Sequence, residues 1–255
     1  MIYDCFLFFN EFELLEIRLN ELGNLVDKFV ICESNYTFQG NPKPLYLLEN
    51  MKKYEKYSDK IIHLVFDAKN IKGGNKQWDR DSGQRNYLIN GLKKCKKDDI
   101  IILSDIDEIP DAKLLLQSLN YLDYYDCLTF YNNFYAFKFN LSIGKWYGTT
   151  VRKYPSVKKI NNMQHFRDFR DKFDKNKICL IDGGWHFTFL GDTDRIQYKF
   201  DNWAHTNDYK IKDMKNLIDN NIYFNNQKLI AVPIDNTFPK YLFDNKDKFK
   251  DLIAE

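Results

Sequence analysis

The chain has 255 residues, of which 44% are hydrophobic and 29% are charged, a balance that is typical of a folded globular protein and excludes disorder as the main state. Lys and Arg exceed Asp and Glu by 38 − 36 = 2, so no strong overall field favours nucleic acid or an anionic membrane as a partner. The length suits one large α/β domain over residues 1–255 rather than two small ones.

Strands and helices are predicted to alternate along the first half of the chain. Continuous apolar runs, typical of strands that are buried on both faces, lie at residues 3–9, 29–32, 61–65 and 100–103. Helices are predicted over residues 14–22, ending at Gly23, and over residues 84–94. Because this order implies right-handed crossovers and a parallel sheet, residues 1–110 are predicted to form a nucleotide-binding half.

The second half, residues 111–255, is less regular. A helix is predicted over residues 112–122, one or two antiparallel strands with a bend over residues 127–139, and a short strand over residues 178–181. The last 20 residues are predicted to form a surface helix or a tail. Since no Pro-rich or Gly/Ser-rich linker divides the halves, the sequence predicts a single domain with a mixed, mostly parallel central sheet.

Three carboxylates directly follow the strand predicted at residues 100–103: Asp105, Asp107 and Glu108. In open α/β sheets ligands bind outside the carboxyl ends of the strands, so these acids are predicted to face a ligand. Asp105 and Asp107 share one face of an extended segment, and two oxygen ligands on one face suit Mg²⁺ or Mn²⁺. Such an ion would neutralise a diphosphate leaving group. The pattern therefore favours a metal-dependent glycosyltransferase with a nucleotide-sugar donor.

Other interpretations of the acidic segment stay open at this point. Asp105 could cap a helix that begins near Pro110, or the acids could solubilise a loop. A phosphatase-type D-x-D-x-[TV] motif would have Thr or Val where this chain has Ile109. A glycoside hydrolase would use paired carboxylates and aromatic platforms without a metal. A noncatalytic carbohydrate-binding protein would explain the 16% aromatic content but not the clustered acids.

A glycine-rich turn is predicted directly after the short strand over residues 178–181. Paired glycines allow a ligand to approach the backbone closely, and an indole offers an apolar platform to a sugar ring. We therefore expect Gly183, Gly184 and Trp185 to bind the acceptor. Asp182, at the start of this turn, is the first candidate for the general base that deprotonates the acceptor hydroxyl, and Glu108 is the second.

Two histidines are further candidate ligands. His186 lies in the same turn, where it could supply a metal nitrogen or a hydrogen bond to the diphosphate. His205 follows Trp203 on a predicted helix and is the rival metal ligand. A histidine beside aromatic residues can also be purely structural. The predicted metal ligands are Asp105, Asp107, His186 and His205.

The nucleotide-sugar donor is predicted to contact polar residues of the first half, in the loop after the second strand and at the start of the helix over residues 84–94. These residues are Glu33, Ser34, Lys43, Gln84, Arg85 and Asp105. The planar guanidinium of Arg85 could clamp a diphosphate, and a surface salt bridge is its alternative role. Neither a P-loop nor a G-x-G-x-x-G sequence is present, so the sequence gives no support for a kinase, an NTPase or a Rossmann dehydrogenase.

Five cysteines stand far apart without a C-x-x-C pair, which predicts reduced thiols and a reducing compartment. The apolar run at residues 5–9 is too short for the core of a signal peptide, and Asp4 precedes it. No run approaches the roughly 18 apolar residues that a transmembrane helix needs. We therefore expect a soluble, cytoplasmic protein.

An ordered series of motifs resembles glycosyltransferase family 17, whose best-known members are β-1,4-mannosyl-glycoprotein β-1,4-N-acetylglucosaminyltransferases. The motifs are Ile2–Phe6, Asn10-Glu11, Leu14–Leu19, Gly40–Leu45, Gln84-Arg85-Asn86, Ser104–Pro110 and Gly184–Phe187. The resemblance covers residues 2–205, and Asp81 stands where the family pattern has Glu. The compact form resembles microbial or large-virus members.

This resemblance implies a GT-A fold, UDP-N-acetylglucosamine as donor, a divalent metal such as Mn²⁺ or Mg²⁺, and inversion at the sugar carbon to give a β linkage. Residues 1–110 would be the nucleotide-sugar-binding half and residues 111–255 the acceptor-binding half. The implied partners are a nucleotide sugar and a glycan.

Overall fold

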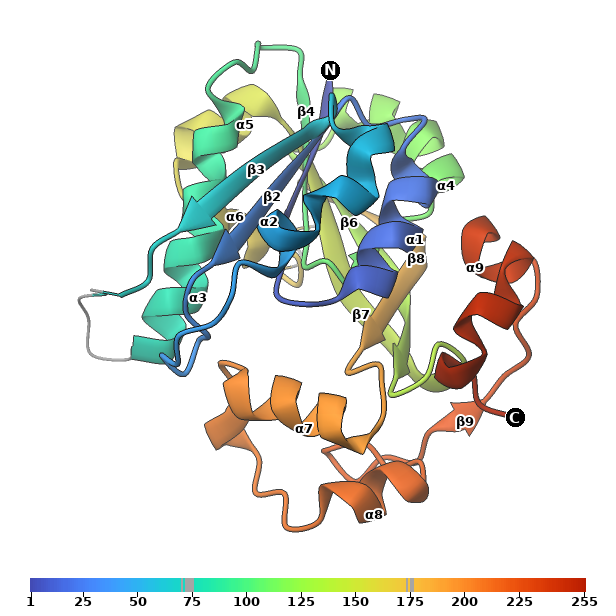
Figure 1. The fold of residues 1–255 in the computed structure, drawn as a ribbon. Helices are drawn as coiled ribbons and strands as arrows, with labels where there is room; N and C mark the ends of the chain where they lie inside the picture. The colour runs from blue at the N-terminus through green and yellow to red at the C-terminus, as the bar shows by residue number, and fades with distance from the viewer. Residues whose placement is uncertain (70, 72–75, 173, 175–176) are drawn as a thin grey trace.

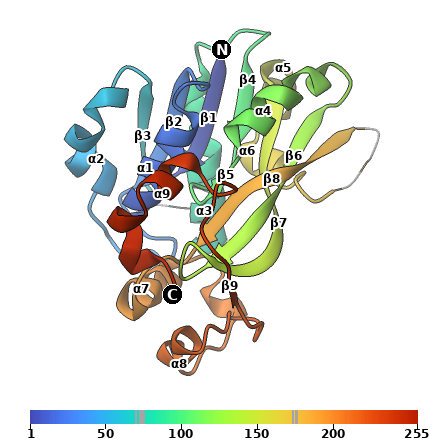
Figure 2. The same cartoon turned by 90° about the vertical axis from the view of Figure 1, so that its right-hand side faces the viewer.

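The computed structural model describes residues 1–69, 71, 76–172, 174 and 177–255. Within these residues a nine-stranded sheet has the order β3-β2-β1-β4-β7-β6-β8-β5, with β9 paired to β7 (Figures 1 and 2). The strands are β1 Ile2–Leu7, β2 Lys28–Ser34, β3 Ile61–Phe66, β4 Ile100–Leu103, β5 Glu108–Ile109, β6 Cys127–Ala136, β7 Leu141–Lys153, β8 Ile178–Thr188 and β9 Ile230–Ala231. The predicted α/β class with a mixed sheet is confirmed.

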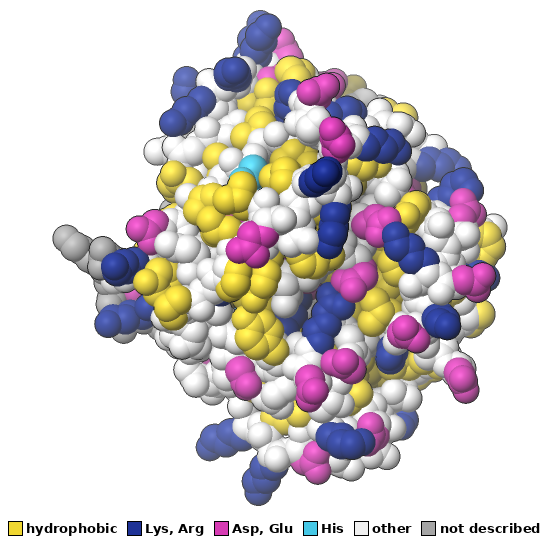
Figure 3. Space-filling view, viewed as in Figure 1, with side chains coloured by type: hydrophobic (Ala, Val, Ile, Leu, Met, Phe, Trp, Pro, Cys, Tyr) yellow, Lys and Arg dark blue, Asp and Glu magenta, His cyan; other side chains and the backbone are white. Residues whose placement is uncertain are grey.

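Helices cover both faces of this sheet. They are α1 Phe12–Leu22, α2 Tyr46–Asn50, α3 Lys76–Tyr87, α4 Ala112–Ser118, α5 Tyr154–Ile160, α6 Met163–Arg167, α7 Thr193–Asn202, α8 Met214–Asp219 and α9 Lys240–Asp244. The 3₁₀ segments are η1 Met51–Tyr57, η2 Leu88–Leu92, η3 Leu119–Asp123, η4 Thr206–Asp208 and η5 Lys246–Leu252. Figures 1 and 2 show α7 and α8 together beyond one end of the sheet. Figure 3 shows basic and acidic side chains interspersed over one face of the molecule.

The first half contains the predicted parallel strands. β3, β2, β1 and β4 pair in parallel. β1, β2 and β4 are apolar runs that are buried between helix layers, whereas the edge strand β3 is only half-buried. The helix predicted over residues 84–94 begins earlier: α3 starts by Lys76 and continues into η2. Arg85 therefore lies in the last turn of α3 and not in its first.

All antiparallel pairs involve strands after β4. The 13-residue strand β7 was not predicted, while the segment predicted over residues 127–139 forms one strand, β6. The predicted glycine-rich turn is wrong, since β8 continues through it to Thr188. Gly183 and Gly184 have φ of 156° and 80° at a bulge opposite β6. A Cβ at Gly184 would lie 2.7 Å from the Ile109 carbonyl oxygen, so this close approach requires glycine.

Two further boundaries differ from the prediction. α7 ends at Asn202, so Trp203 and His205 follow the helix instead of lying on it. The C-terminal segment is more than a surface tail, because Leu242 of α9 and Phe249 of η5 are buried in the core that contains α1. Among the described residues, no helix has the length and apolar character that crossing a membrane requires.

Candidate active site

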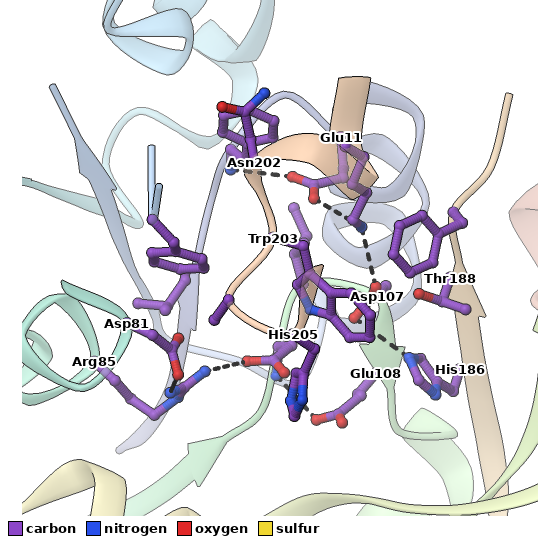
Figure 4. Close-up of a pocket in the computed structure, with 18 of the residues that line it drawn as sticks. Glu11, Asp81, Arg85, Asp107, Glu108, His186, Thr188, Asn202, Trp203 and His205 are labelled. Atoms are coloured by element: carbon purple, nitrogen blue, oxygen red, sulfur yellow. Dashed lines mark hydrogen bonds and ion pairs between the residues drawn. The ribbon is translucent and has the colours of Figure 1, made fainter. Parts of the chain in front are cut away.

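A cavity of about 660 Å³ opens where β1, β2 and β4 end. β1 pairs with β2 on one side and with β4 on the other, so the direction of strand order reverses there. Such a switch point is where open α/β sheets bind their ligands. The other walls come from α3, α6 and α7 and from β6, β7 and β8 (Figure 4). The volume lies in the range of small-molecule sites.

A buried arginine of α1 shapes the acidic segment after β4. Arg18 pairs with Asp4 through N–O distances of 2.6 and 2.7 Å. Its Nη1 donates to the carbonyl oxygens of Asp105 at 3.1 Å and Glu108 at 2.9 Å, and its Nη2 donates to Ser104 Oγ at 2.7 Å. The guanidinium thus satisfies carbonyls of a turn that leaves the sheet, and it fixes where the acids point. The helix after Pro110 is capped by Asp111, not by Asp105.

Asp105 lies between two arginines. Its Oδ1 accepts a hydrogen bond of 2.9 Å from Arg85 Nη2, and its Oδ2 pairs with Arg167 Nη2. Burial disfavours the carboxylate, but the two guanidinium charges hold the pKa of Asp105 well below its usual range. Arg85 is 4% exposed and also pairs with Asp81 at 2.8 Å, so the surface salt bridge considered for Arg85 is excluded.

Asp107 faces His186 (Figure 4) and also contacts Lys199. Its Oδ1 lies 3.6 Å from His186 Nε2 of β8, and its Oδ2 lies 3.3 Å from Lys199 Nζ of α7. Lys199 Nζ also lies 3.0 Å from Glu11 Oε1. Burial opposes the charge of Asp107, but Lys199 and His186 lower the pKa of this carboxyl to about 2. The carboxylate is therefore ionised at neutral pH.

Glu108 is the most buried of the three acids, with no exposed surface. Its Oε1 accepts hydrogen bonds from Trp146 Nε1 at 2.8 Å and Arg167 Nη2 at 3.1 Å, and its Oε2 accepts from the Asp105 amide at 3.0 Å. Burial raises the pKa of Glu108; Arg167 opposes this rise and the charge of Asp105 adds to it. A carboxylate with a raised pKa is a stronger base than an exposed one.

The pair formed by Asp107 and His186 suits a divalent cation better than Asp105 does. Ligands about 2.1 Å from one ion are about 3.0 Å apart at a right angle and about 4.2 Å apart on opposite sides, so donors at 3.6 Å can share it. Both oxygens of Asp105 already contact arginines. No group of three His, Cys, Asp or Glu side chains in the described ranges could hold an ion without other ligands. A bound ion would therefore need oxygens from a substrate.

Aromatic side chains surround the cavity on the side of β2. His205 packs against Trp78 of α3 and Trp203, with ring centroids 4.3 and 4.6 Å apart. The predicted rival metal ligand pairs instead with Asp208 at 2.6 Å. Gln39 Nε2 donates to the Trp203 carbonyl at 2.6 Å, which ties the loop after β2 to the segment after α7. These flat apolar faces suit a nucleobase.

The structure separates the residues predicted to contact the donor into two groups. Lys43, Gln84, Arg85 and Asp105 line the cavity. Glu33 and Ser34 are buried and absent from its wall: Glu33 accepts hydrogen bonds from the Leu47 and Leu48 amides at 3.0 and 2.9 Å. Ser34 Oγ accepts from the Tyr36 amide at 3.2 Å. Both therefore shape the loop that borders the cavity.

The residues predicted to contact the acceptor lie outside the cavity wall. Trp185 is 4% exposed within the core, and its Nε1 donates to the Thr237 carbonyl at 3.0 Å. Gly183 and Gly184 form the bulge of β8, and Asp182, with its side chain 71% exposed, pairs with Lys145 at 2.5 Å. In this structure Asp182 and the Gly-Gly-Trp segment do not meet the Asp107 site.

Several cavity residues were not predicted at all: Glu11, Trp146, Arg167, Arg170 and Lys199. The basic and aromatic series Arg167-Asp168-Phe169-Arg170 is the sequence signal that could have indicated two of them.

The sequence pattern of glycosyltransferase family 17 matches residues 1–254. The chain belongs to glycosyltransferase family 17. It is therefore a glycosyltransferase, which confirms the family expected from the motifs and the enzyme class expected from the acidic segment.

Curated relatives of this family 17 chain include beta-1,4-mannosyl-glycoprotein 4-beta-N-acetylglucosaminyltransferases of Rattus norvegicus and Homo sapiens, each 26% identical over 290 aligned residues. Each match covers 96% of this chain and 53% of the relative, so the chain spans about half the length of these proteins. Among solved structures, S. aureus TarS 1–349 has 13% identity and a TM-score of 0.41, with 78% of this chain and 62% of that chain covered. A Francisella tularensis 2-C-methyl-D-erythritol 4-phosphate cytidylyltransferase has 11% identity and a TM-score of 0.41, with 77% and 97% covered.

Proposed function

We propose that this family 17 enzyme transfers N-acetylglucosamine from UDP-N-acetylglucosamine to a hydroxyl of a glycan, with inversion to a β linkage and with a divalent cation. The observation that carries the proposal is the set of ionised groups around Asp105 and Asp107 at the switch point of the sheet. The names of the curated relatives support the sugar and the linkage. We also propose that residues 1–110 and 111–255 are the nucleotide-sugar-binding and acceptor-binding halves of one domain.

In this proposal the donor crosses the cavity from the aromatic side to the acids. The uracil lies near Trp78 and Trp203, and the diphosphate lies near Arg85 and Lys199. Burial disfavours the charge of Lys199, but Glu11 and Asp107 raise the pKa of its ammonium, which therefore stays protonated. Fixed positive charges in a site with little water stabilise the negative charge that develops on the leaving diphosphate.

The divalent cation, Mn²⁺ or Mg²⁺, would be held by Asp107 and His186 together with oxygens of the substrate. When bound, it supplies further positive charge to the leaving diphosphate. Asp105 keeps a separate task in this proposal, because its contacts with Arg85 and Arg167 orient both guanidinium groups toward the cavity.

Inversion in one displacement requires a base that takes the proton of the acceptor hydroxyl while that oxygen bonds to the sugar carbon and the bond to the diphosphate breaks. Glu108 is the proposed base, since of the two residues predicted for this role only Glu108 lines the cavity. Its raised pKa favours proton acceptance.

A thermal-shift screen of nucleotide sugars tests the donor and the metal together. A ligand that binds the native state raises its stability by RT ln(1 + [L]/Kd). We expect UDP-N-acetylglucosamine to raise the melting temperature with Mn²⁺ present and to have little effect without it. An equal shift with GDP-mannose, or no shift with any donor, would contradict the proposal. Hydrolysis of a glycan without any nucleotide sugar would support a glycoside hydrolase instead.

A further inference from the structure

The cavity also extends along β6, β7 and β8, beyond the acids that follow β4. Across the sheet, β7, β6 and β8 follow β4, and their residues Phe134, Trp146 and His186 line this part. Tyr223, from the segment after α8, closes it by packing on Phe134 with ring centroids 5.8 Å apart. We call this part the acceptor lobe. Its floor is made of Phe134, Trp146 and Tyr223.

The acceptor lobe has an exposed polar rim. Lys145, Asn225 and Gln227 are exposed at the cavity edge, and Gln227 is held by a hydrogen bond of 2.7 Å from its Nε2 to the Ile143 carbonyl. The ammonium of Lys145 is already neutralised by Asp182. An aromatic floor with hydroxyl-binding groups at its edge is suited to a sugar ring, which has apolar faces and a polar perimeter.

A buried donor without a partner lies beside the same lobe. Arg170 lies over the Trp146 ring at 5.2 Å from its centroid. Its Nη1 is buried and has no hydrogen-bond partner among the described residues. A buried donor of this kind normally has a partner, because leaving it unpaired costs free energy. Because this nitrogen is covered by other protein atoms, a hydroxyl oxygen of a ligand in the lobe would satisfy it once the guanidinium turned toward the lobe.

Trp146 connects the lobe to the proposed base. Its indole N–H donates to Glu108 Oε1 at 2.8 Å, and its ring lies 5.1 Å from the ring of His186. The hydrogen bond fixes the indole next to the carboxylate. A sugar packed on this indole would therefore have a hydroxyl close to the group that must remove its proton.

We propose that the acceptor lobe binds the acceptor sugar ring of the glycan, with its apolar face on Trp146 and its hydroxyls bound by Arg170 and Asn225. This inference rests on the proposed transferase function. It replaces the Gly-Gly-Trp segment as the place of acceptor binding, and it assigns Arg170 and Asn225 as specificity-determining residues.

Variants on the two sides of the cavity test the proposal by dissociating acceptor from donor binding. For Arg170→Met we expect the KM for p-nitrophenyl β-D-mannopyranoside to rise about ten- to a hundredfold, the range of a lost charged hydrogen bond, with the Kd for UDP-N-acetylglucosamine changing less than twofold. Asn225→Ala, on the exposed rim, should raise this KM about threefold to tenfold. Trp78→Ala should have the reverse effect: the Kd for UDP-N-acetylglucosamine should rise, and the KM for the acceptor should stay unchanged. Tyr124→Ala, 80% exposed, is the control for both constants.

The result also separates this inference from the proposed function. If Arg170→Met and Asn225→Ala instead raise the Kd for UDP-N-acetylglucosamine, the lobe binds the transferred sugar. That result would overturn the inference, while the transferase function would stand. Saturation-transfer NMR of wild-type protein with UDP and a panel of p-nitrophenyl β-glycosides gives a second readout. If no sugar of the panel binds, the acceptor lobe is refuted, whereas absence of UDP-sugar binding would refute the proposed function itself.

Discussion

The two halves of the chain bring opposite charges to the cavity. Residues 1–110 supply the acids Glu11, Asp105, Asp107 and Glu108, whereas residues 111–255 supply the cations Arg167, Arg170 and Lys199; the exceptions are Lys43 and Arg85 in the first half and Asp168 in the second. Buried charges are stable only when they are paired, so neither set can stay buried without the other. The ion pairs of the site therefore also hold the two halves of the chain together. A diphosphate that enters must compete with acids for the same cations.

The largest effect is expected from the acid that faces both His186 and Lys199. Asp107→Asn keeps the shape of the side chain and removes its charge, so transfer should fall by about two to three orders of magnitude, equivalent to roughly 3 to 4 kcal/mol. Specific activity and melting temperature across a Mn²⁺ titration measure this. Asp111→Asn is the matched control, since it caps α4 outside the cavity wall and Asn also caps well. Wild-type turnover in folded Asp107→Asn would refute the metal assignment.

The next largest effect is expected at the ion pairs that connect the two halves. Arg167→Gln removes the ion pair of Glu108 and one of the two ion pairs of Asp105, which keeps its contact with Arg85, so the free energy of unfolding should fall by about 3 kcal/mol. Adding Asp105→Asn removes the negative charge that lies next to the unpaired Glu108 and should restore part of this loss. Urea unfolding of both single variants and the double variant measures the coupling. Strictly additive losses would show that the halves are not joined through this pair.

The pH dependence of stability should carry the signature of Asp107. Its folded pKa of about 2 lies below the ordinary 3.8, so ionised Asp107 stabilises the fold above about pH 4. That contribution, on the order of 2 kcal/mol, is lost as pH falls from about 4 through 2. The difference in unfolding free energy between wild type and Asp107→Asn should shrink over this window. A difference that stays constant from pH 5 to 2 would exclude the charge pairing with Lys199 and His186.

The smallest effect is expected at Trp185. Trp185→Phe removes the hydrogen bond to the Thr237 carbonyl, at a cost of about 1 kcal/mol, and should lower the melting temperature by roughly 2 to 4 °C. Because the side chain is buried outside the cavity, the KM for the acceptor should not change. A raised acceptor KM at unchanged stability would return acceptor binding to this segment.

The sequence predicted the part of the site that lies at the ends of the parallel strands. β1, β2 and β4 are apolar runs because helices cover both their faces, and the acids that follow β4 then had to lie at the ligand edge. The five-residue helix α6 and the ten-residue α7 carry Arg167 and Lys199, which are placed by tertiary contacts that no periodic pattern records.

The errors in the second half have equally local causes. β7 mixes polar residues, aromatic residues and two glycines, Gly144 and Gly148, so it lacks a strand-like alternation. Gly183-Gly184 was predicted as a turn because glycine pairs usually end strands, whereas here they form a bulge inside β8. The predicted acceptor residues followed from that error.

The C-terminal segment sets the order in which this fold can be completed during synthesis. Leu242 and Phe249 belong to the core that covers α1, and Tyr241 Oη donates to Glu16 of α1 at 2.5 Å. About 220 residues separate α1 from α9. Because ribosomes add roughly 5 to 20 residues per second, α9 is synthesised about 10 to 40 s after α1. During that time the part of its apolar surface that Leu242 and Phe249 cover is exposed on the nascent chain. The helix that carries Arg18 thus presents, before the chain is complete, the kind of apolar surface on which chaperones act.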